Sequence, residues 1–197
     1  MIQTAITLAK AAEQRKAEIE QARNLPTDLM ERVKAAGLVQ MWRTKTENHQ
    51  PLSVKEATKT IQSIAYHNGS LAWVVGVTNC SSLITGFIPA EMTDQLYPSS
   101  ASMAGGFAGP AGVAQLSKDG LLVSGNWSWG SGITHCTTIV GGVRLMKNDK
   151  MVGAGVVFFS PDEVEFEDNW QVVGLKGTHS IDYKTTDTFI PNGRWIP

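Results

Sequence analysis

The hydrophobic pattern of this sequence changes its period once, at the Tyr97-Pro98-Ser99-Ser100 segment. Before this segment, apolar residues recur every three or four positions, as they do on one face of a helix. After it, apolar and polar residues alternate in short runs between glycine-bearing turns, as they do in strands. Helices followed by strands predict an α+β fold. We therefore expect a helical domain at 1–98 and a β domain, an antiparallel barrel or sandwich, at 99–197.

Five helices are expected in the first half of the chain. Ser53 and Glu56 form a capping box that opens one of them, since each side chain can bond the other residue's backbone N–H. Another is apolar nearly all round between Leu71 and Ile88, so we expect it to lie buried at the centre of the helical half. The expected helices run over 2–22, 26–36, 53–67, 70–88 and 89–96.

Strands are expected throughout the second half. Lys118-Asp119-Gly120 and Lys147–Lys150 are typical of hairpin turns. The segment Gly105–Gly112 is expected to be a loop, because its glycines and Pro110 suit neither a packed helix nor a central strand. The expected strands run over 102–108, 113–117, 121–130, 136–146, 151–159, 163–167 and 183–190.

Composition and pattern argue against several kinds of partner. The 197 residues carry 17 basic and 18 acidic side chains without a basic stripe, so nucleic acid is not an expected partner. The longest apolar run is interrupted by Thr78, Asn79 and Ser81, so we expect no membrane span. No cluster of metal ligands is apparent. Cys80 and Cys136 lack metal spacing, and we expect both to be free buried thiols in a reducing cytoplasm.

A candidate cofactor site lies between Gly105 and Gly132. A glycine-rich loop is followed there by a strand on which Trp127 and Trp129 are expected to share one face. Ser131 comes next, between two glycines. A flat aromatic cofactor with polar edges needs backbone donors, an aromatic wall and one side-chain donor, and this stretch offers all three. The loop has neither the dinucleotide-binding nor the triphosphate-binding glycine signature.

Several motifs occur in order along nearly the whole chain. Phe107–Ala114 and Ser124–Ser131 resemble the loop and the strand that cradle a flavin in the acyl-CoA dehydrogenase superfamily. The closest branch is the two-component flavin-dependent monooxygenases, which take reduced flavin from a separate reductase. The other segments similar to that branch are Leu25-Pro26, Ala36-Gly37-Leu38, Gly69–Trp73, Asp168-Asn169-Trp170, Gly174–Ser180 and Phe189-Ile190-Pro191.

This resemblance implies a flavin-dependent oxidoreductase, and first a monooxygenase that uses reduced FMN or FAD on an aromatic or heteroaromatic small molecule. Trp129 would pack beside the flavin ring, and Ser131 would be the catalytic residue, with a hydrogen bond near flavin N5. A substrate pocket would include Trp73, Cys80 and Ser81. The implied partner is a flavin reductase, and the protein would form a homo-oligomer or pair with another subunit. The implied flavin-binding residues are Phe107, Ala108, Gly109, Gly112, Val113, Trp129, Gly130 and Ser131.

Two alternatives stay open, because the chain departs from the superfamily in places. The superfamily continues into a C-terminal helical bundle, which is expected to be absent after Pro197. Val113 and Ala114 replace acidic and hydroxyl residues of the superfamily's loop, and His179 replaces a glycine. One alternative is an acyl-CoA dehydrogenase acting on the CH–CH group of an acyl thioester, although no carboxylate base is apparent. The other is a truncated, non-catalytic subunit or scaffold.

Three histidines carry separate expectations. His49 lies in a polar connector and is expected to be solvated. His67 is near a helix end, where it is expected to interact with the helix dipole. His135 is expected either to pack within a strand or, following the resemblance, to face the flavin edge.

Overall fold

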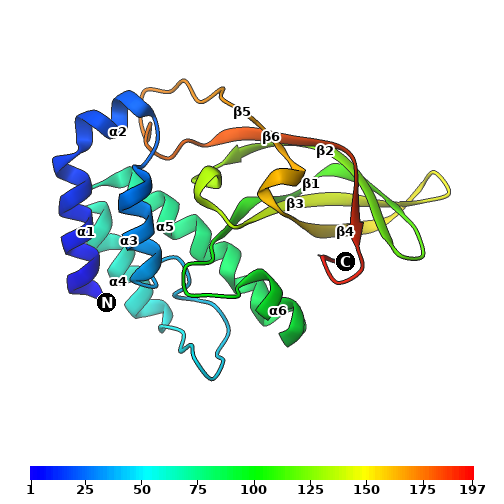
Figure 1. Ribbon diagram of the computed structural model, residues 1–197, viewed down its shortest axis with the longest axis horizontal. Coiled ribbons are helices and arrows are strands. Elements are labelled where there is room, and N and C mark those ends of the chain that lie inside the picture. The colour runs from blue at the N-terminus through cyan, green and yellow to red at the C-terminus, as the bar shows by residue number, and fades with distance from the viewer. The chain divides into compact units, whose positions relative to one another are not determined.

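A computed structural model describes residues 1–197 as six α-helices followed by a seven-stranded sheet (Figure 1). The expected α+β class is confirmed. The chain divides into two compact units. Met1–Met103 and Trp170–His179 form the helical unit, and Ala104–Asn169 and Ser180–Pro197 form the sheet unit. The domain limits expected from the sequence, 1–98 and 99–197, remain a prediction.

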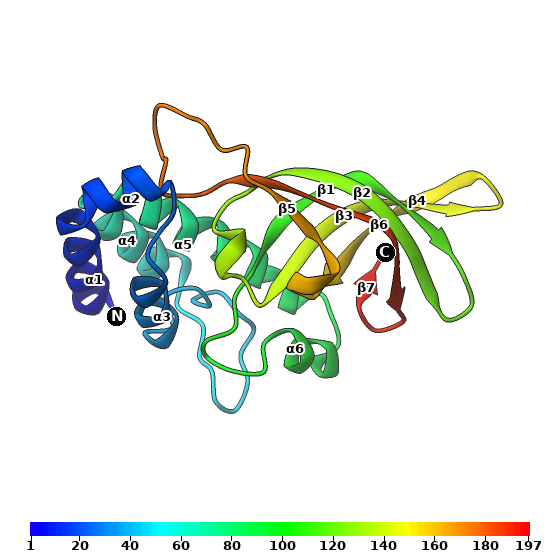
Figure 2. The same cartoon turned by 45° about the horizontal axis from the view of Figure 1, so that its top comes forward.

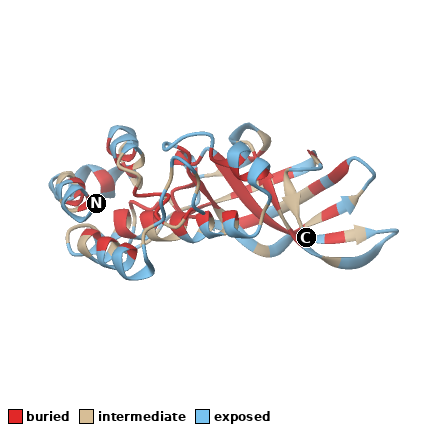
Figure 3. Ribbon diagram, turned by 90° about the horizontal axis from the view of Figure 1, so that it is seen from below, coloured by how far each residue is buried: buried red, intermediate tan, exposed pale blue.

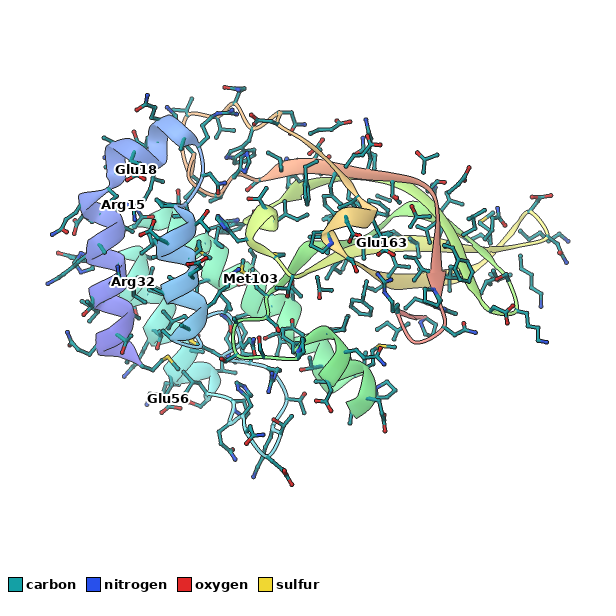
Figure 4. The ribbon with its side chains drawn as sticks, in the orientation of Figure 1. Arg15, Glu18, Arg32, Glu56, Met103 and Glu163 are labelled. Carbon is teal, nitrogen blue, oxygen red and sulfur yellow. The ribbon has the colours of Figure 1, made fainter.

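The helices of the first half follow the expected order, with one break. The expected helix at 2–22 is interrupted at Arg15, whose backbone leaves the helical region at φ −97° and ψ 18°. At the break, the Arg15 guanidinium bonds Glu18 at 2.8 Å and Asp28 at 2.7 Å; Figure 4 labels Arg15 and Glu18. Because of this cation, the pKa values of both carboxyls lie below their ordinary range. The helices are α1 Ile2–Gln14, α2 Lys16–Ala22, α3 Thr27–Ala35, α4 Val54–Ala65, α5 Gly69–Ser82 and α6 Ala90–Leu96.

The helix expected to be buried at the centre, α5, is shorter and more exposed than its composition suggests. It ends at Ser82 and continues as a 3-10 turn, Leu83–Gly86. One face is buried even though it carries polar groups, because Thr78 donates to the Val74 carbonyl and Asn79 donates to the Leu38 carbonyl at 2.7 Å. The opposite face is exposed, and Figure 3 shows buried and exposed bands along the helices.

The capping box expected at the start of α4 is confirmed. Ser53 Oγ accepts from the Glu56 backbone N–H at 3.2 Å, and the Glu56 carboxylate accepts from the Ser53 backbone N–H at 3.1 Å. The hydrogen bond from the Ser53 hydroxyl holds the pKa of Glu56 below its ordinary value. The cap therefore stabilises the helix above the ordinary pKa of a glutamate, and this contribution is lost as the pH falls through the depressed value.

Replacing Ser53 by alanine is expected to lower the free energy of unfolding by about 1 kcal/mol, because it removes the N-cap acceptor. Urea unfolding followed by circular dichroism measures the change. Ser63→Ala is the matched control, since the Ser63 hydroxyl bonds only the Thr60 carbonyl within the same helix. The difference between Ser53→Ala and the unaltered protein should shrink in acid. An equal loss in both variants would contradict the assignment of the cap.

The sheet is open and mixed, with the strand order β5-β6-β2-β1-β3-β4-β7 (Figures 1 and 2). This corrects the expected antiparallel barrel or sandwich, because β1 pairs antiparallel with β2 but parallel with β3. The segment between β2 and β3 is only seven residues long, 131–137, and carries the chain past the start of β1. The strands are β1 Ala104–Leu116, β2 Gly120–Gly130, β3 Thr138–Lys147, β4 Lys150–Phe159, β5 Glu165–Glu167, β6 Ile181–Pro191 and β7 Trp195–Ile196.

The glycine-rich segment is part of β1 and not a free loop, which corrects the expectation from its composition. Along β3, the pairing jumps from Phe107 opposite Gly141 to Gly112 opposite Val143. Ala108–Ala111 therefore face the single residue Gly142 and form a β-bulge. A Cβ atom at Gly142 would lie 2.1 Å from the Ala108 carbonyl oxygen, so this close approach requires glycine.

The core of the sheet unit is built around Trp127, which is fully buried. Its ring stacks on Tyr183 with centroids 5.4 Å apart and also contacts Phe159 at 5.5 Å. The indole Nε1 donates to the Gly142 carbonyl at 2.8 Å, so the buried polar atom is satisfied. This side chain thus joins β2, β3, β4 and β6.

No helix combines the length and the apolar character that crossing a bilayer requires.

Candidate functional site

The end of β2 carries an exposed tryptophan in an unusual backbone conformation. Trp129 has φ +64° and is 67% exposed, whereas Trp127 two residues earlier is fully buried. The expectation that both rings share one face is therefore wrong. The register with β6 shifts between Trp127 and Gly130, and this irregularity turns the second ring outward. A bulky residue with positive φ is a genuine outlier, and such strain is often found at functional sites.

Asp182 of β6 stabilises this strained turn. Its carboxylate accepts from the Ser128 hydroxyl at 3.0 Å and from the Trp129 backbone N–H at 3.3 Å. Its own N–H donates to the Asn169 side-chain oxygen at 3.1 Å. Asp182 thus anchors the backbone on both sides of the Ser128–Trp129 peptide, which fixes the turn from which the exposed indole projects.

Ser131 lies directly after this turn and is 8% exposed. Its Oγ is 2.7 Å from the Oγ of Ser180, which is 3% exposed. Either hydroxyl can be the donor. The following residue, Gly132, has φ +64°, a value that glycine adopts without steric cost and that lets the chain turn into the 3-10 helix Ile133–His135. The hydroxyl is therefore buried and paired at the base of the turn.

The β1 bulge is attached to the same part of β6. The Phe107 N–H donates to the Tyr183 hydroxyl at 2.7 Å, and this hydroxyl donates to the Val140 carbonyl at 2.5 Å. Burial raises the pKa of Tyr183, so the hydroxyl keeps its proton and can serve both bonds at neutral pH. Ser180 and Tyr183, three residues apart, thus contact Ser131 and Phe107 respectively. The structure thus brings the two segments singled out from the sequence to residues three apart, at the start of β6.

The eight residues expected to bind flavin differ in exposure. Trp129, Phe107 and Ala108 are exposed, and Gly109 and Val113 are half-buried. Gly112, Gly130 and Ser131 are buried. A Cβ atom at Gly112 would meet the Trp127 ring at 2.5 Å, and one at Gly130 would meet Ile133 at 2.6 Å, so these two glycines allow close packing. The roles of all eight toward a cofactor remain predictions.

The residues expected to line a substrate pocket lie on one face of α5 in the helical unit. Trp73 is 50% exposed, Cys80 is exposed and Ser81 is half-buried. Spacings of seven and eight residues place them on the same side of a helix. Both cysteines are free, but only Cys136 is buried, which corrects the expected burial of Cys80.

The histidines contribute less to this site. His135 is buried in the 3-10 helix after Gly132. His49 is half-buried rather than fully solvated, and its pKa is lowered first by burial and then by the nearby Arg43 cation. His67 Nδ1 lies 2.9 Å from a Glu13 carboxylate oxygen. No group of three or more histidine, cysteine or acidic side chains is placed to hold a metal ion.

The sequence did not indicate the roles of Asp182 and Tyr183, because their partners are distant along the chain. Nor did it indicate a cavity of about 950 Å³ within the helical unit. Arg43 and His49 line this cavity, together with residues of α6 and the segment that follows it. None of the residues predicted to bind flavin or substrate lines it.

Known proteins resemble the chain in both sequence and structure, although no protein-family model matches it. The indole-3-acetate monooxygenase of Acinetobacter baumannii is 27% identical over 167 residues, which are 83% of this chain and 42% of that protein. The flavin-dependent monooxygenase oxygenase subunit HsaA of Mycobacterium tuberculosis is 30% identical over 144 residues, 72% of this chain and 35% of the subunit.

The similarity of fold is closer than that of sequence. The crystal structure of the HsaA monooxygenase from M. tuberculosis matches 99% of this chain and 52% of its own, with a TM-score of 0.89 and 21% identity. XiaF from Streptomyces sp., in complex with FADH2 and glycerol, matches 99% of this chain and 50% of its own, with a TM-score of 0.92 and 24% identity. The chain shares the fold of the matched half of each of these two structures. It spans about half the length of these structures, and less than half of the curated relatives.

Proposed function

We propose that this chain forms the flavin-binding part of a monooxygenase that takes reduced flavin from a separate reductase and oxygenates an aromatic small molecule. The observation that carries the proposal is the pair of an exposed, strained Trp129 and a buried Ser131 at the end of one strand. The names of the relatives, an indole-3-acetate monooxygenase and an oxygenase subunit, support it, as does a similar structure in complex with FADH2.

The residues present fit the ring of a flavin. Trp129 offers a flat, largely exposed apolar surface, and the Asp182 bonds fix the backbone turn that carries it. Ser131 supplies a hydroxyl at the base of the same turn. The exposed Phe107 begins a bulge whose small residues, Ala108–Ala111, let a ligand approach the backbone closely.

Reduced flavin, when bound, supplies the electrons with which molecular oxygen is activated. The chain's own residues would bind the flavin and orient its ring. When flavin is bound, the Ser131 hydroxyl would hydrogen-bond near its N5, Trp129 would pack against the ring, and Phe107 would keep water from its edge. On α5, Trp73, Cys80 and Ser81 offer an aromatic surface with a thiol and a hydroxyl, which suits an aromatic substrate.

Flavin titration tests the proposal. Oxidised FMN and FAD are added with detection by flavin fluorescence, and the reduced forms are added without oxygen. Binding of reduced flavin is expected, and oxygen consumption with an aromatic substrate is expected once a reductase supplies it. An acyl-CoA thioester should not bleach the bound flavin, as it would in a dehydrogenase. A folded chain that binds neither flavin in either redox state would end the proposal.

Replacing Ser131 by alanine is expected to weaken flavin binding by about 3- to 10-fold, the equivalent of one hydrogen bond. Turnover should fall further where charge develops on the ring. Ser124→Ala on the same strand is the matched control, since Ser124 bonds Asp187 at 3.0 Å and does not contact Ser131. Equal affinity and turnover in Ser131→Ala and the unaltered chain would remove Ser131 from this role.

A further inference from the structure

We propose that the cavity of about 950 Å³ in the helical unit binds a hydroxyl-rich small molecule with one phosphate or carboxylate group, which pairs with Arg43. Every residue that lines this cavity belongs to Met1–Met103, so the cavity lies within one unit. None of the residues proposed to bind flavin or substrate lines it. A ligand bound here would therefore be additional to the flavin and the substrate of the proposed function.

Arg43 is a buried cation that no carboxylate neutralises. Only 8% of the residue is exposed. Its Nη1 donates to the Gln40 side-chain oxygen at 3.0 Å and to the Tyr97 carbonyl at 3.3 Å, and its Nη2 donates to the Thr46 hydroxyl at 3.3 Å. All three acceptors are uncharged, whereas the more exposed Arg15 bonds two carboxylates. Since buried charges in proteins are normally paired, Arg43 lacks the negative partner that its burial calls for.

Part of the hydrogen-bonding capacity of Arg43 is also unused. A guanidinium carries five N–H donors, and Arg43 uses three of them. Its Nε is enclosed by the protein without a hydrogen-bond partner, and so is Nε2 of His49 in the same wall. Nη2 keeps a second proton for a ligand. Unpaired polar atoms in a buried site often mark a bound water or ion, so an anion beside Nη2 would supply both the charge and the acceptor that Arg43 lacks.

The surroundings of Arg43 are electrically positive. The pKa of His49 lies below its ordinary value, first because of burial and then because of the Arg43 cation, so His49 is neutral at pH 7. Lys45 adds a second cation to the wall of the cavity, and Glu47 and Asp94 add two carboxylates. Neither carboxylate bonds Arg43, and neither contributes to the shift at His49. The positive charge of Arg43 therefore remains available to an anion that enters the cavity.

The rest of the wall favours a hydroxyl-rich ligand over an apolar one. A cavity of about 950 Å³ has room for a small molecule and is larger than a single ion needs. Ile88 is the only branched aliphatic side chain that lines it. Glu47 and Asp94 can accept hydrogen bonds from ligand hydroxyls, and they disfavour a ligand that is anionic along its whole length. Sugar phosphates and sugar acids have the required combination. Hydroxyl and amide groups in the wall come from Thr44, Thr46, Asn48, Thr93, Ser99 and Ser100.

Isothermal titration of the full chain with three matched sugars tests the inference. Glucose, glucose-6-phosphate and glucuronate share one ring and differ in the group at its sixth carbon. At least one of the two anions should bind, and glucose should bind about tenfold more weakly or less, because it lacks the charge-assisted bond to Arg43. The anion that binds more tightly identifies phosphate or carboxylate as the preferred group.

Replacing Arg43 by glutamine is expected to weaken the bound anion by about tenfold or more, with little change for glucose. Lys59→Gln is the matched control, because it removes one positive charge from an exposed position of α4 that does not line the cavity. Its affinity for the anion should equal that of the unaltered chain. Equal weakening by both substitutions would show that only the net charge of the protein matters, and this would overturn the assignment to Arg43.

A second pair of variants tests the cavity while Arg43 stays in place. Gly86 lines the cavity, and a Cβ atom there would meet only the Thr44 hydroxyl oxygen, at an ordinary 3.6 Å. Gly86→Asp adds a negative charge to the wall, and Gly86→Asn adds a side chain of the same shape without the charge. The aspartate variant should bind the anion about tenfold more weakly than the asparagine variant, because like charges repel. Both should bind glucose equally.

Three results would overturn the inference. One is the absence of binding by either anion up to about 10 mM. Another is glucose binding as tightly as the anions. The third is equal affinity of Gly86→Asp and Gly86→Asn for the anion. Binding of inorganic phosphate as tight as that of glucose-6-phosphate would overturn the assignment of a hydroxyl-rich ligand. All of these results would leave the proposed flavin function standing, since flavin titration measures it separately.

Discussion

Replacing Trp127 by alanine is expected to lower the free energy of unfolding of the sheet unit by about 3–5 kcal/mol. The indole is fully buried against Tyr183 and Phe159, and its removal leaves a cavity between four strands. It also leaves the Gly142 carbonyl without the donor it now has. Urea unfolding followed by far-ultraviolet circular dichroism measures the loss without relying on tryptophan fluorescence.

Trp129→Ala is the matched control for this prediction. The ring is 67% exposed, so its loss should change the free energy of unfolding by less than about 0.5 kcal/mol, as at most surface sites. Flavin affinity should nevertheless fall, because the ring surface is gone. Trp127 would thus contribute mainly to stability, and Trp129, two residues later, mainly to flavin binding. Equal destabilisation by both substitutions would show that Trp129 packs in the core, and the flavin assignment would lose its main support.

Replacing Gly106 by alanine is expected to destabilise the sheet unit by about 3 kcal/mol or more, since strain and overpacking act together. The residue has φ +143°, a conformation that side chains rarely adopt. A Cβ atom there would lie 2.1 Å from the Val140 carbonyl oxygen and 2.7 Å from the Tyr183 hydroxyl. The bond from Phe107 to Tyr183 would be displaced, so flavin affinity should fall as well.

Gly153→Ala separates this effect from a general cost of alanine in the sheet. Gly153 lies in β4, where a Cβ atom would meet only a Leu145 methyl group at an ordinary 3.9 Å. The free energy of unfolding of this variant should stay within about 0.5 kcal/mol of the unaltered protein, or rise slightly, because glycine inside a strand is less favourable than alanine. A similar loss at both positions would contradict the steric argument. Thermal unfolding at equal pH and ionic strength compares the two.

Local signals in the sequence were sufficient for most elements and insufficient for their arrangement. The capping box at Ser53 and the turn at Lys147–Lys150 depend on neighbouring residues only, and the structure confirms both. The parallel pairing of β1 with β3 could not be predicted, since alternation indicates a strand but not its partner. The glycine content of Gly105–Gly112 predicts a loop where the structure has the bulge at Ala108–Ala111, because glycine content alone does not distinguish the two.

The candidate site was predictable as a stretch of chain but not as an arrangement in space. Trp129 and Ser131 stood out because an aromatic residue and a hydroxyl occurred among glycines. The outward turn of Trp129 depends on Asp182, which follows it by 53 residues, and the partner of Ser131 follows it by 49. Periodicity carries no information about contacts over such separations. The contacts of Asp182 with Trp129 and of Ser180 with Ser131 are therefore known only from the structure.

The chain joins its two units three times, at Met103–Ala104, Asn169–Trp170 and His179–Ser180. Trp170–His179 is tied to the helical unit by the bond from Arg23 to the Trp170 carbonyl and by the bridge between Asn24 and Thr178. Dividing the gene once, at Met103–Ala104, would therefore leave the helical fragment without Trp170–His179. The sheet fragment would carry these ten residues although they do not belong to its unit. A better design replaces these ten residues by a tight turn in the sheet fragment. It then adds Trp170–His179 to the helical fragment as a separate peptide.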